Sequence, residues 1–152
     1  MNETENKINE IIEHIKQWFD ENGNNANAII GISGGKDSTV ATALCVKALG
    51  KDRVIGVLMP NGEQPDIDDS KKVVEFLGIK HITVNINDMY NAFIENLKND
   101  LFISDDTKIN LPPRIRMSVL YAIAQSCNGR VINTCNRSED YVGYSTKYGD
   151  SA

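Results

Sequence analysis

Two patterns of apolar residues alternate along the chain: apolar residues at helical spacing and short continuous apolar runs. Residues 3–22 carry apolar side chains at helical spacing, which predicts an amphipathic helix that ends near Gly23. Its apolar stripe consists of Ile8, Ile11, Ile12, Ile15, Trp18 and Phe19. Residues 28–32 then form a short apolar run without alternation, which is typical of a strand buried on both faces. A glycine-rich turn and a second helical segment over residues 37–49 follow.

Further apolar runs predict three more strands, at residues 54–59, 81–85 and 131–134. Strands of this kind that alternate with helices predict an α/β fold of three layers, α/β/α, with a parallel, doubly wound sheet. Ligands of such sheets bind beyond the carboxyl ends of the strands, near the point where the strand order reverses. The loops that we expect at this edge are residues 33–38, 60–66 and 134–147.

Three helices are expected between and after these strands, and each begins with a residue type that suits a helix N-terminus. They run from Asp66 to Leu77, from a cap at Asn87 or Asp88 to Leu97, and from Pro112-Pro113 to Cys127. Residues 99–110 and 135–152 are polar and are predicted to be loops, the first of them mobile.

Composition excludes several classes of protein. The 152 residues fit one domain, and 41% apolar residues suffice for a core. A net charge of −5 argues against general nucleic-acid binding, which needs a basic surface. No apolar run approaches the ~20 residues of a membrane helix, and the polar N-terminus does not resemble a signal peptide. Cys45, Cys127 and Cys135 show no CxxC spacing, so we expect reduced thiols, a cytoplasmic location and no zinc site.

The charge is unevenly distributed. Residues 1–106 have a net charge of −8, whereas residues 107–152 have a net charge of +3. A basic C-terminal third on an acidic chain indicates a local anion site, although ordinary scatter is an equally good interpretation.

The loop Ser33-Gly34-Gly35-Lys36-Asp37-Ser38 is the strongest local signal. Its glycines let backbone N–H groups approach a phosphate, and the following helix N-terminus adds positive potential. The Walker pattern requires Ser or Thr after the lysine, and here Asp37 follows Lys36. A carboxylate would repel phosphate unless a metal ion bridges them, so Asp37 implies Mg²⁺. The alternative is a tight glycine turn in which Asp37 caps the helix.

This loop resembles the pyrophosphate loop of the N-type ATP pyrophosphatases, which cleave ATP to AMP and pyrophosphate while adenylating a substrate oxygen. Three later segments resemble, in order and spacing, segments of the ammonia-dependent NAD⁺ synthetases within that superfamily. They are Pro113–Met117, Asn133–Glu139 and Gly143–Asp150. Asn133 stands where that family usually has glycine, and asparagine tolerates left-handed backbone angles better than most residues. The resemblance implies the adenine nucleotide alpha hydrolase-like variety of the predicted fold.

The resemblance also implies roles for individual residues. ATP would be bound by Gly31, Ile32, Ser33, Gly34, Gly35, Lys36, Asp37, Ser38 and Thr134. Deamido-NAD⁺ would be bound by Arg114, Tyr144 and Lys147, and Mg²⁺ would be ligated by Asp37 and Glu139. The chemistry of the residues agrees, because Arg114, Arg116 and Lys147 are cations suited to a diphosphate and a carboxylate. The arginines also suit a solvated first helical turn, and the tyrosines suit ordinary packing.

The implied reaction is the ATP-dependent amidation of deamido-NAD⁺ by ammonia through an NAD-adenylate, with release of AMP and pyrophosphate. It needs no covalent nucleophile, and none is identified, since Cys135 has no histidine near it in the sequence. The resemblance further implies a homodimer, for which the helix with Trp18 and Phe19 is a plausible interface, although its apolar stripe could equally be core. The charge and the apolar pattern predict no nucleic-acid and no membrane partner.

The resemblance implies that residues 1–152 form a single synthetase-like domain whose N-terminal amphipathic helix spans residues 1–24. It also implies that family members continue beyond the position of Ala152, where further ATP and substrate contacts and part of a lid are expected. Two alternatives remain: another adenylating enzyme such as a tRNA-modifying ligase, or a catalytically incomplete fragment that binds ATP and deamido-NAD⁺.

Overall fold

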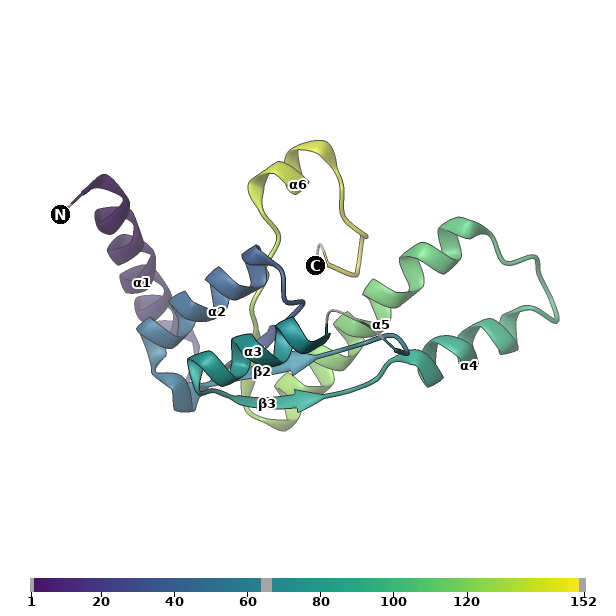
Figure 1. The fold of residues 1–152 in the computed structure, drawn as a ribbon, viewed down its shortest axis with the longest axis horizontal. Coiled ribbons are helices and arrows are strands. Elements are labelled where there is room, and N and C mark those ends of the chain that lie inside the picture. The colour runs from purple at the N-terminus through teal and green to yellow at the C-terminus, as the bar shows by residue number, and fades with distance from the viewer. Residues whose placement is uncertain (1, 64–66, 151–152) are drawn as a thin grey trace.

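The computed structural model describes residues 2–63 and 67–150, in which helices and strands alternate as the apolar pattern predicts. The elements, shown in Figure 1, are α1 (Glu3–Asn22), β1 (Asn27–Gly31), α2 (Lys36–Leu49), the short 3-10 helix η1 (Lys51–Arg53), β2 (Val54–Leu58), α3 (Ile67–Leu77), β3 (Lys80–Thr83), α4 (Asn87–Leu97), α5 (Asp105–Ser126), β4 (Gly129–Val131) and α6 (Arg137–Val142).

The four strands form one parallel sheet in the order β3-β2-β1-β4. Ile29 of β1 lies opposite Ile55 of β2 on one side and opposite Val131 of β4 on the other. The chain therefore builds the sheet outwards from β1 to β3 and then crosses to the other side of β1. This reversal confirms the predicted doubly wound sheet and puts the switch point between β1 and β4.

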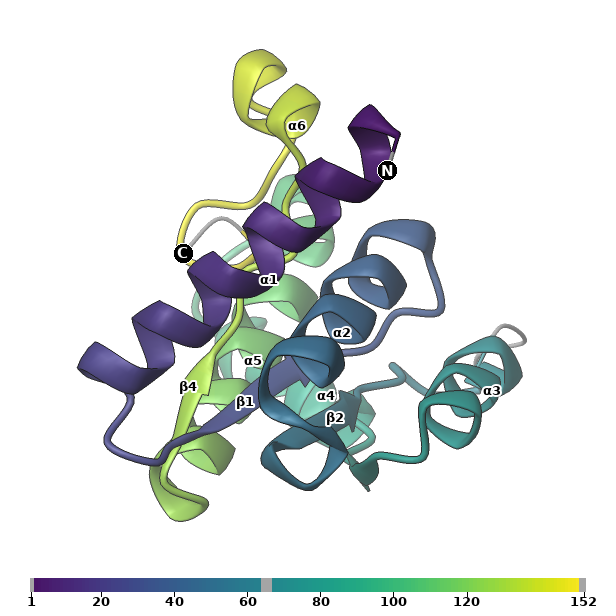
Figure 2. The same ribbon diagram turned by 90° about the vertical axis from the view of Figure 1, so that its left-hand side faces the viewer.

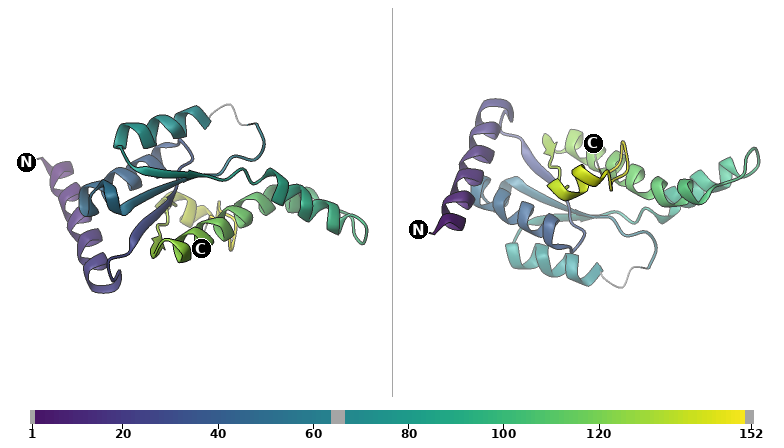
Figure 3. Two further views of the ribbon diagram at one scale, coloured as in Figure 1. Left: turned by 90° about the horizontal axis from the view of Figure 1, so that it is seen from below. Right: turned by 90° about the horizontal axis from the view of Figure 1, so that it is seen from above.

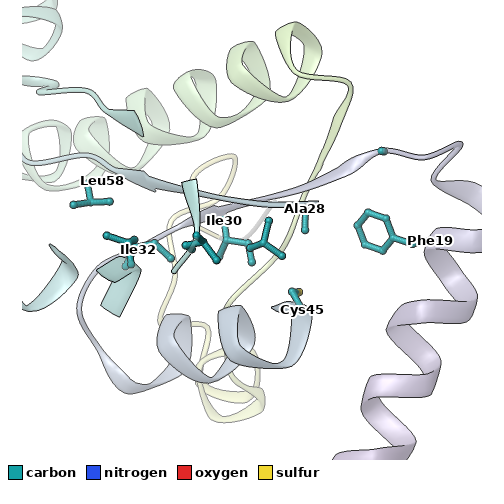
Figure 4. Packing of buried hydrophobic residues seen from close by; sticks show 10 residues of the cluster. Phe19, Ala28, Ile30, Ile32, Cys45 and Leu58 are labelled. Carbon is teal, nitrogen blue, oxygen red and sulfur yellow. The ribbon is translucent and has the colours of Figure 1, made fainter. Parts of the chain in front are cut away.

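Helices cover both faces of the sheet (Figures 2 and 3). On one face, alternate residues of β1 pack against α1, α2 and α3, as Figure 4 shows for Phe19, Ala28, Ile30, Ile32, Cys45 and Leu58. On the other face, Ile29 and Val57 pack with Ile86 and with Ile115 and Leu120 of α5. Because both faces of the sheet are buried at β1, the sequence of this strand is an unbroken apolar run.

Helix α5 begins earlier than predicted. Its N-cap is Ser104, whose hydroxyl accepts a hydrogen bond from the N–H of Thr107 at 3.2 Å, and Pro112 and Pro113 lie inside the helix. The prediction that the prolines open the helix is wrong, and residues 105–110 of the predicted mobile loop are helical. The prolines lack an N–H, but the turns before them have their own cap and an Asp105–Lys108 ion pair at 2.9 Å.

Other predicted boundaries are also wrong. The segment 135–152, predicted to be loop, contains helix α6. Strand β4 ends at Val131 instead of beginning there, and β3 ends at Thr83. Neither Asn87 nor Asp88 caps α4. Its N-cap residue is Ile86, and the Oδ1 atom of Asn85 accepts the N–H of Asn87.

Figures 1 and 3 show α4 and the first half of α5 extending away from the sheet as an antiparallel pair. No helix in the described part of the chain combines the length and the apolar character needed to cross a bilayer.

Candidate functional site

The glycine turn after β1 is closed by two serines. The hydroxyls of Ser33 and Ser38 lie 3.0 Å apart, and the N–H of Ser33 donates to Ser38 Oγ at 3.3 Å. The N–H of Gly35 donates to Ser33 Oγ at 3.2 Å. Helix α2 begins at Lys36, so its N-terminus adds positive potential at the loop. The loop therefore has the geometry of an anion site at the carboxyl end of a buried strand.

Gly34 brings this turn against the start of α3. Its φ is +82°, and a Cβ at this position would lie 3.2 Å from both the backbone nitrogen and the hydroxyl of Ser70. Both the backbone angle and the close approach require glycine. Two helix starts, those of α2 and α3, thus meet at the loop.

Asn136 is hydrogen-bonded to both of the predicted metal carboxylates. Its Nδ2 donates to Asp37 Oδ2 at 3.3 Å, and its backbone N–H donates to Glu139 Oε2 at 2.9 Å. Asn136 also caps α6, since its Oδ1 accepts the N–H groups of Ser138 and Glu139. The loop after β4 is thereby joined to the phosphate-type loop after β1.

The Asp37 and Glu139 carboxylates fit a magnesium ion shared with phosphates. The other oxygens of the two groups, Asp37 Oδ1 and Glu139 Oε1, have no hydrogen-bond partner among the described residues. Over residues 2–63 and 67–150, no group of three or more His, Cys, Asp or Glu side chains gathers where it could hold a metal by itself. Magnesium commonly takes only one or two protein carboxylates, with phosphates and waters as its remaining ligands.

A cavity of about 340 Å³ opens at the carboxyl ends of the strands. Of the residues predicted to bind ATP, Gly31, Ile32, Ser33 and Thr134 line it. Residues 34–38 lie further along the loop and do not line the cavity. The rest of the wall is largely apolar and comes from the end of β2, α3, α5 and the segment after β4.

The residues predicted to bind deamido-NAD⁺ are only partly brought together. Nε–H of Arg114 donates to the carbonyl oxygen of Lys147 at 3.2 Å, which joins α5 to the segment after α6. The Lys147 ammonium lies 5.0 Å from the ring centroid of Tyr148. Tyr144 is 81% exposed, and the part of the chain that the structure describes shows no hydrogen bond from its side chain to Arg114 or Lys147.

The segment 143–150 is docked on α5 through Thr146 and Gly149. The Thr146 hydroxyl donates to Asn110 Oδ1 at 2.8 Å, and the Thr146 N–H donates to Asp150 Oδ1 at 2.6 Å. Gly149 is buried, and a Cβ there would lie 2.9 Å from Cβ of Pro113. This docking brings Asp150 into the cavity wall.

Sequence reasoning missed two residues of the site, Asn136 and Ser70, and named a third, Arg116, only as a cation suited to the dinucleotide. Asn136 was recognisable as the first residue of an Asn-x-x-Glu capping pattern. Ser70 is 2% exposed and lines the cavity, but no sequence pattern marks it. Arg116 lines the cavity half-buried, with Nε–H donating to the Met59 carbonyl oxygen at 3.0 Å. Burial lowers the pKa of the Arg116 guanidinium, and the nearby Asp150 charge opposes that shift.

A family model described as NAD synthase matches residues 7–152. The NH(3)-dependent NAD(+) synthetase of Pyrococcus horikoshii is 45% identical over 144 residues, which cover 93% of this chain and 54% of that protein. The protein of the same name from Methanocaldococcus jannaschii is 44% identical, and the match covers 95% of this chain and 58% of that protein. The chain thus spans about half the length of the curated relatives it matches.

Solved structures agree with the family match. The NH3-dependent NAD synthetase of Campylobacter jejuni superposes with a TM-score of 0.90 at 29% identity, covering 100% of this chain and 65% of that one. The NMN synthetase of Francisella tularensis superposes with a TM-score of 0.82 at 36% identity, covering 95% of this chain and 61% of that one.

Proposed function

Because this chain belongs to the NAD synthase family, we propose that it carries the ATP site of a ligase that amidates deamido-NAD⁺ to NAD⁺ with ammonia. The observation that supports this most is the link through Asn136, which holds Asp37 beside the phosphate loop and Glu139 at the same edge of the sheet. The proposal takes residues 1–152 as one domain of a cytoplasmic enzyme.

In the proposed reaction, the nicotinate carboxylate of deamido-NAD⁺ attacks the α-phosphorus of ATP and pyrophosphate leaves. Ammonia then attacks the carbonyl carbon of the NAD-adenylate, and AMP leaves. The hydroxyls of Ser33 and Ser38, which meet in the turn, and the positive N-terminus of α2 would hold the phosphates in place. Mg²⁺ held by Asp37 and Glu139 would supply charge neutralisation at the phosphates.

Arg114 and Lys147 are proposed to bind the dinucleotide. They come from α5 and from the segment after α6, and Arg114 bonds to the backbone carbonyl of Lys147, so both residues lie where that segment meets α5. Paired cations suit the diphosphate of deamido-NAD⁺. Tyr144 is proposed to lie near the nicotinate ring, and its exposed side chain is accessible to a ligand.

Product analysis tests the proposal. The chain is incubated with ATP, Mg²⁺, deamido-NAD⁺ and ammonium, and NAD⁺ and AMP are measured by mass spectrometry. We expect both products in equal amounts, and neither with Asp37→Asn. ATP binding without NAD⁺ at saturating ammonium would contradict the activity for this chain and favour a nucleotide-binding fragment.

Two further experiments distinguish deamido-NAD⁺ from other candidate substrates. Nicotinate mononucleotide replaces deamido-NAD⁺ in one, because a structural neighbour is named NMN synthetase. Amidation of the mononucleotide alone would contradict the dinucleotide as substrate. Filter binding with tRNA tests the tRNA-modifying alternative, which the net charge of −5 does not favour.

We also propose that the protein is a homodimer in which α1 takes part. Trp18 is 41% exposed on α1, whereas Phe19, named with it above, is 2% exposed and belongs to the core. Light scattering after size exclusion should give the mass of a dimer, and Trp18→Ser should shift it towards the monomer. Phe76→Ser on α3, where the ring is 89% exposed, is the matched control. A monomeric parent chain would contradict the proposal.

A further inference from the structure

Arg116 is the charged residue that α5 contributes to the wall of the 340 Å³ cavity. Its Nε–H donates to the Met59 carbonyl oxygen at 3.0 Å. Within the described residues, no other hydrogen bond and no ion pair involves the guanidinium. An arginine has five N–H donors, so four are left for a ligand or for water.

The surroundings of Arg116 favour an anionic ligand. A half-buried cation without a bonded carboxylate is unfavourable until an anion or water satisfies its donors. Asp150 lines the same cavity, but its carboxylate accepts the Thr146 N–H at 2.6 Å and forms no ion pair with Arg116 among the described residues. The Arg116 donors are therefore available to a molecule that enters the cavity.

The arrangement of the cavity indicates which part of a nucleotide meets Arg116. Only the first part of the phosphate loop, residues 31–33, lines the cavity, together with apolar side chains such as Ile32, Ile67 and Ile132. The remainder of the loop and the carboxylates of Asp37 and Glu139 do not line it. In a nucleotide whose base packs among these apolar side chains, the first phosphate is the one nearest the cavity that Arg116 lines, and the later phosphates extend over the loop.

We propose that Arg116, which the resemblance did not assign, binds the α-phosphate of the nucleotide and is a catalytic residue of the adenylation step. The assignment rests on the proposed function. When the carboxylate oxygen bonds to the α-phosphorus and the bond to the pyrophosphate oxygen breaks, negative charge stays on the two non-bridging oxygens. Arg116 offers two parallel N–H groups to those oxygens and neither gains nor loses a proton.

The test compares ligands that differ only in phosphate. Dissociation constants of ATP, AMP and adenosine are measured by calorimetry for the parent chain and for Arg116→Gln, Arg116→Lys and Lys108→Gln. Loss of a charge-assisted hydrogen bond should weaken ATP and AMP roughly 10- to 100-fold in Arg116→Gln and leave adenosine unchanged. Arg116→Lys keeps the charge without the planar fork, so we expect a smaller loss. Lys108, exposed on the same helix, is the matched control and should bind all three ligands like the parent.

Adenosine separates a phosphate contact from a structural role. Equal weakening of adenosine and AMP in Arg116→Gln would mean that the cavity has collapsed and would overturn the assignment. Unchanged AMP affinity would overturn it as well. If Arg116→Gln does not fold, an Arg116→Lys chain with parent affinity for AMP contradicts the proposal by itself. A parent chain that binds no nucleotide contradicts the proposed function instead.

Discussion

At the scale of single residues, Asn136 contributes to two structures at once. Its Oδ1 caps α6, and its Nδ2 reaches Asp37, 99 positions away in the chain. The side-chain amide is suited to this because it combines an acceptor and a donor, which neither aspartate nor serine can do with the same geometry. Because its backbone N–H donates to Glu139 Oε2, Asn136 also connects the Glu139 carboxylate to that of Asp37.

Asn136→Asp separates the two roles. Aspartate is as good an N-cap as asparagine, so α6 should remain folded. It has no donor for Asp37 and adds a negative charge there, so Mg²⁺-dependent ATP affinity should change at least severalfold. Calorimetry with and without Mg²⁺ measures this, and circular dichroism checks the fold. Identical ATP binding in the variant and the parent would show that the link has no role in the site.

Gly34 and Gly50 allow strain and crowding to be told apart. Both have a φ of +82°, but only at Gly34 would a Cβ meet neighbours, whereas at Gly50 nothing lies within 4 Å. Gly50→Ala should lower the free energy of unfolding by about 1–3 kcal/mol through backbone strain. Gly34→Ala should lower the free energy of unfolding by more than Gly50→Ala does, and it should also weaken ATP binding. Urea unfolding and ATP titration test both variants, and equal stability losses would refute the crowding at Ser70.

Cys45 is 1% exposed, and burial raises the pKa of its thiol to about 11. At pH 8 almost none of it is thiolate, the form that reacts. Alkylation by iodoacetamide should therefore modify the half-buried Cys127 and Cys135 first, and Cys45 only in denaturant. Peptide mass spectrometry gives the order of modification. Rapid alkylation of Cys45 in native conditions would contradict the packing of α2 on β1.

At the scale of elements, α5 connects the features of the site. Its first two turns belong to the antiparallel pair with α4, its middle carries Pro113, Arg114 and Arg116, and its last turns pack on the sheet. The segment 143–150 docks on it through Thr146 and Gly149. Substrate contacts predicted from separate motifs therefore depend on one helix.

The start of α5 depends on its cap. Ser104→Ala removes the acceptor of the Thr107 N–H, so the first turn should lose about 1 kcal/mol of stability. Hydrogen exchange of amides 105–111 should accelerate about fivefold, because that free energy sets the local opening equilibrium. Ser104→Asp restores an acceptor and is the control. If amides 105–111 of the alanine variant exchange as slowly as those of the parent chain, the prolines and not the cap determine where the helix begins.

At the scale of the whole molecule, the sheet order determines which loops meet. The order β3-β2-β1-β4 puts the loop after β4 next to the loop after β1, with α3 and α5 on opposite faces (Figure 3). Each face has its own apolar cluster, so the loops are held between two packed layers. The position of the site at this edge is thus a property of the topology.

Ligand binding should stabilise the whole fold. At 100 times the dissociation constant, a ligand that binds only the folded chain adds about 2.7 kcal/mol. For a domain of this size, that corresponds to a rise of roughly 5–10 °C in melting temperature. We expect this rise with ATP and Mg²⁺ in thermal scans, and a smaller one with Asp37→Asn. An equal rise in both chains would contradict a metal role for Asp37.

Much of this fold was predictable because its signals are local. The unbroken apolar run of β1, the stripe of α1 and the glycine turn at 33–35 are each set by neighbouring residues. The start of α5 was not predictable from the prolines, because a cap eight residues before Pro112 stabilises the turns that lead to them. Helix α6 was missed because its six residues show no apolar periodicity and are stabilised by their capping box.

The alternation of strands and helices, the parallel sheet and the glycine turn after β1 follow from the amino-acid pattern alone, since periodicity and glycine act over a few residues. The contact of Asn136 with Asp37, and the separate places of Arg116 in the cavity wall and Arg114 at the Lys147 segment, arise only from the packed fold. Residues two positions apart on a helix point about 200° apart, so the packing of α5 decides which arginine faces the cavity. Such contacts depend on how whole helices and strands pack, which no local pattern records.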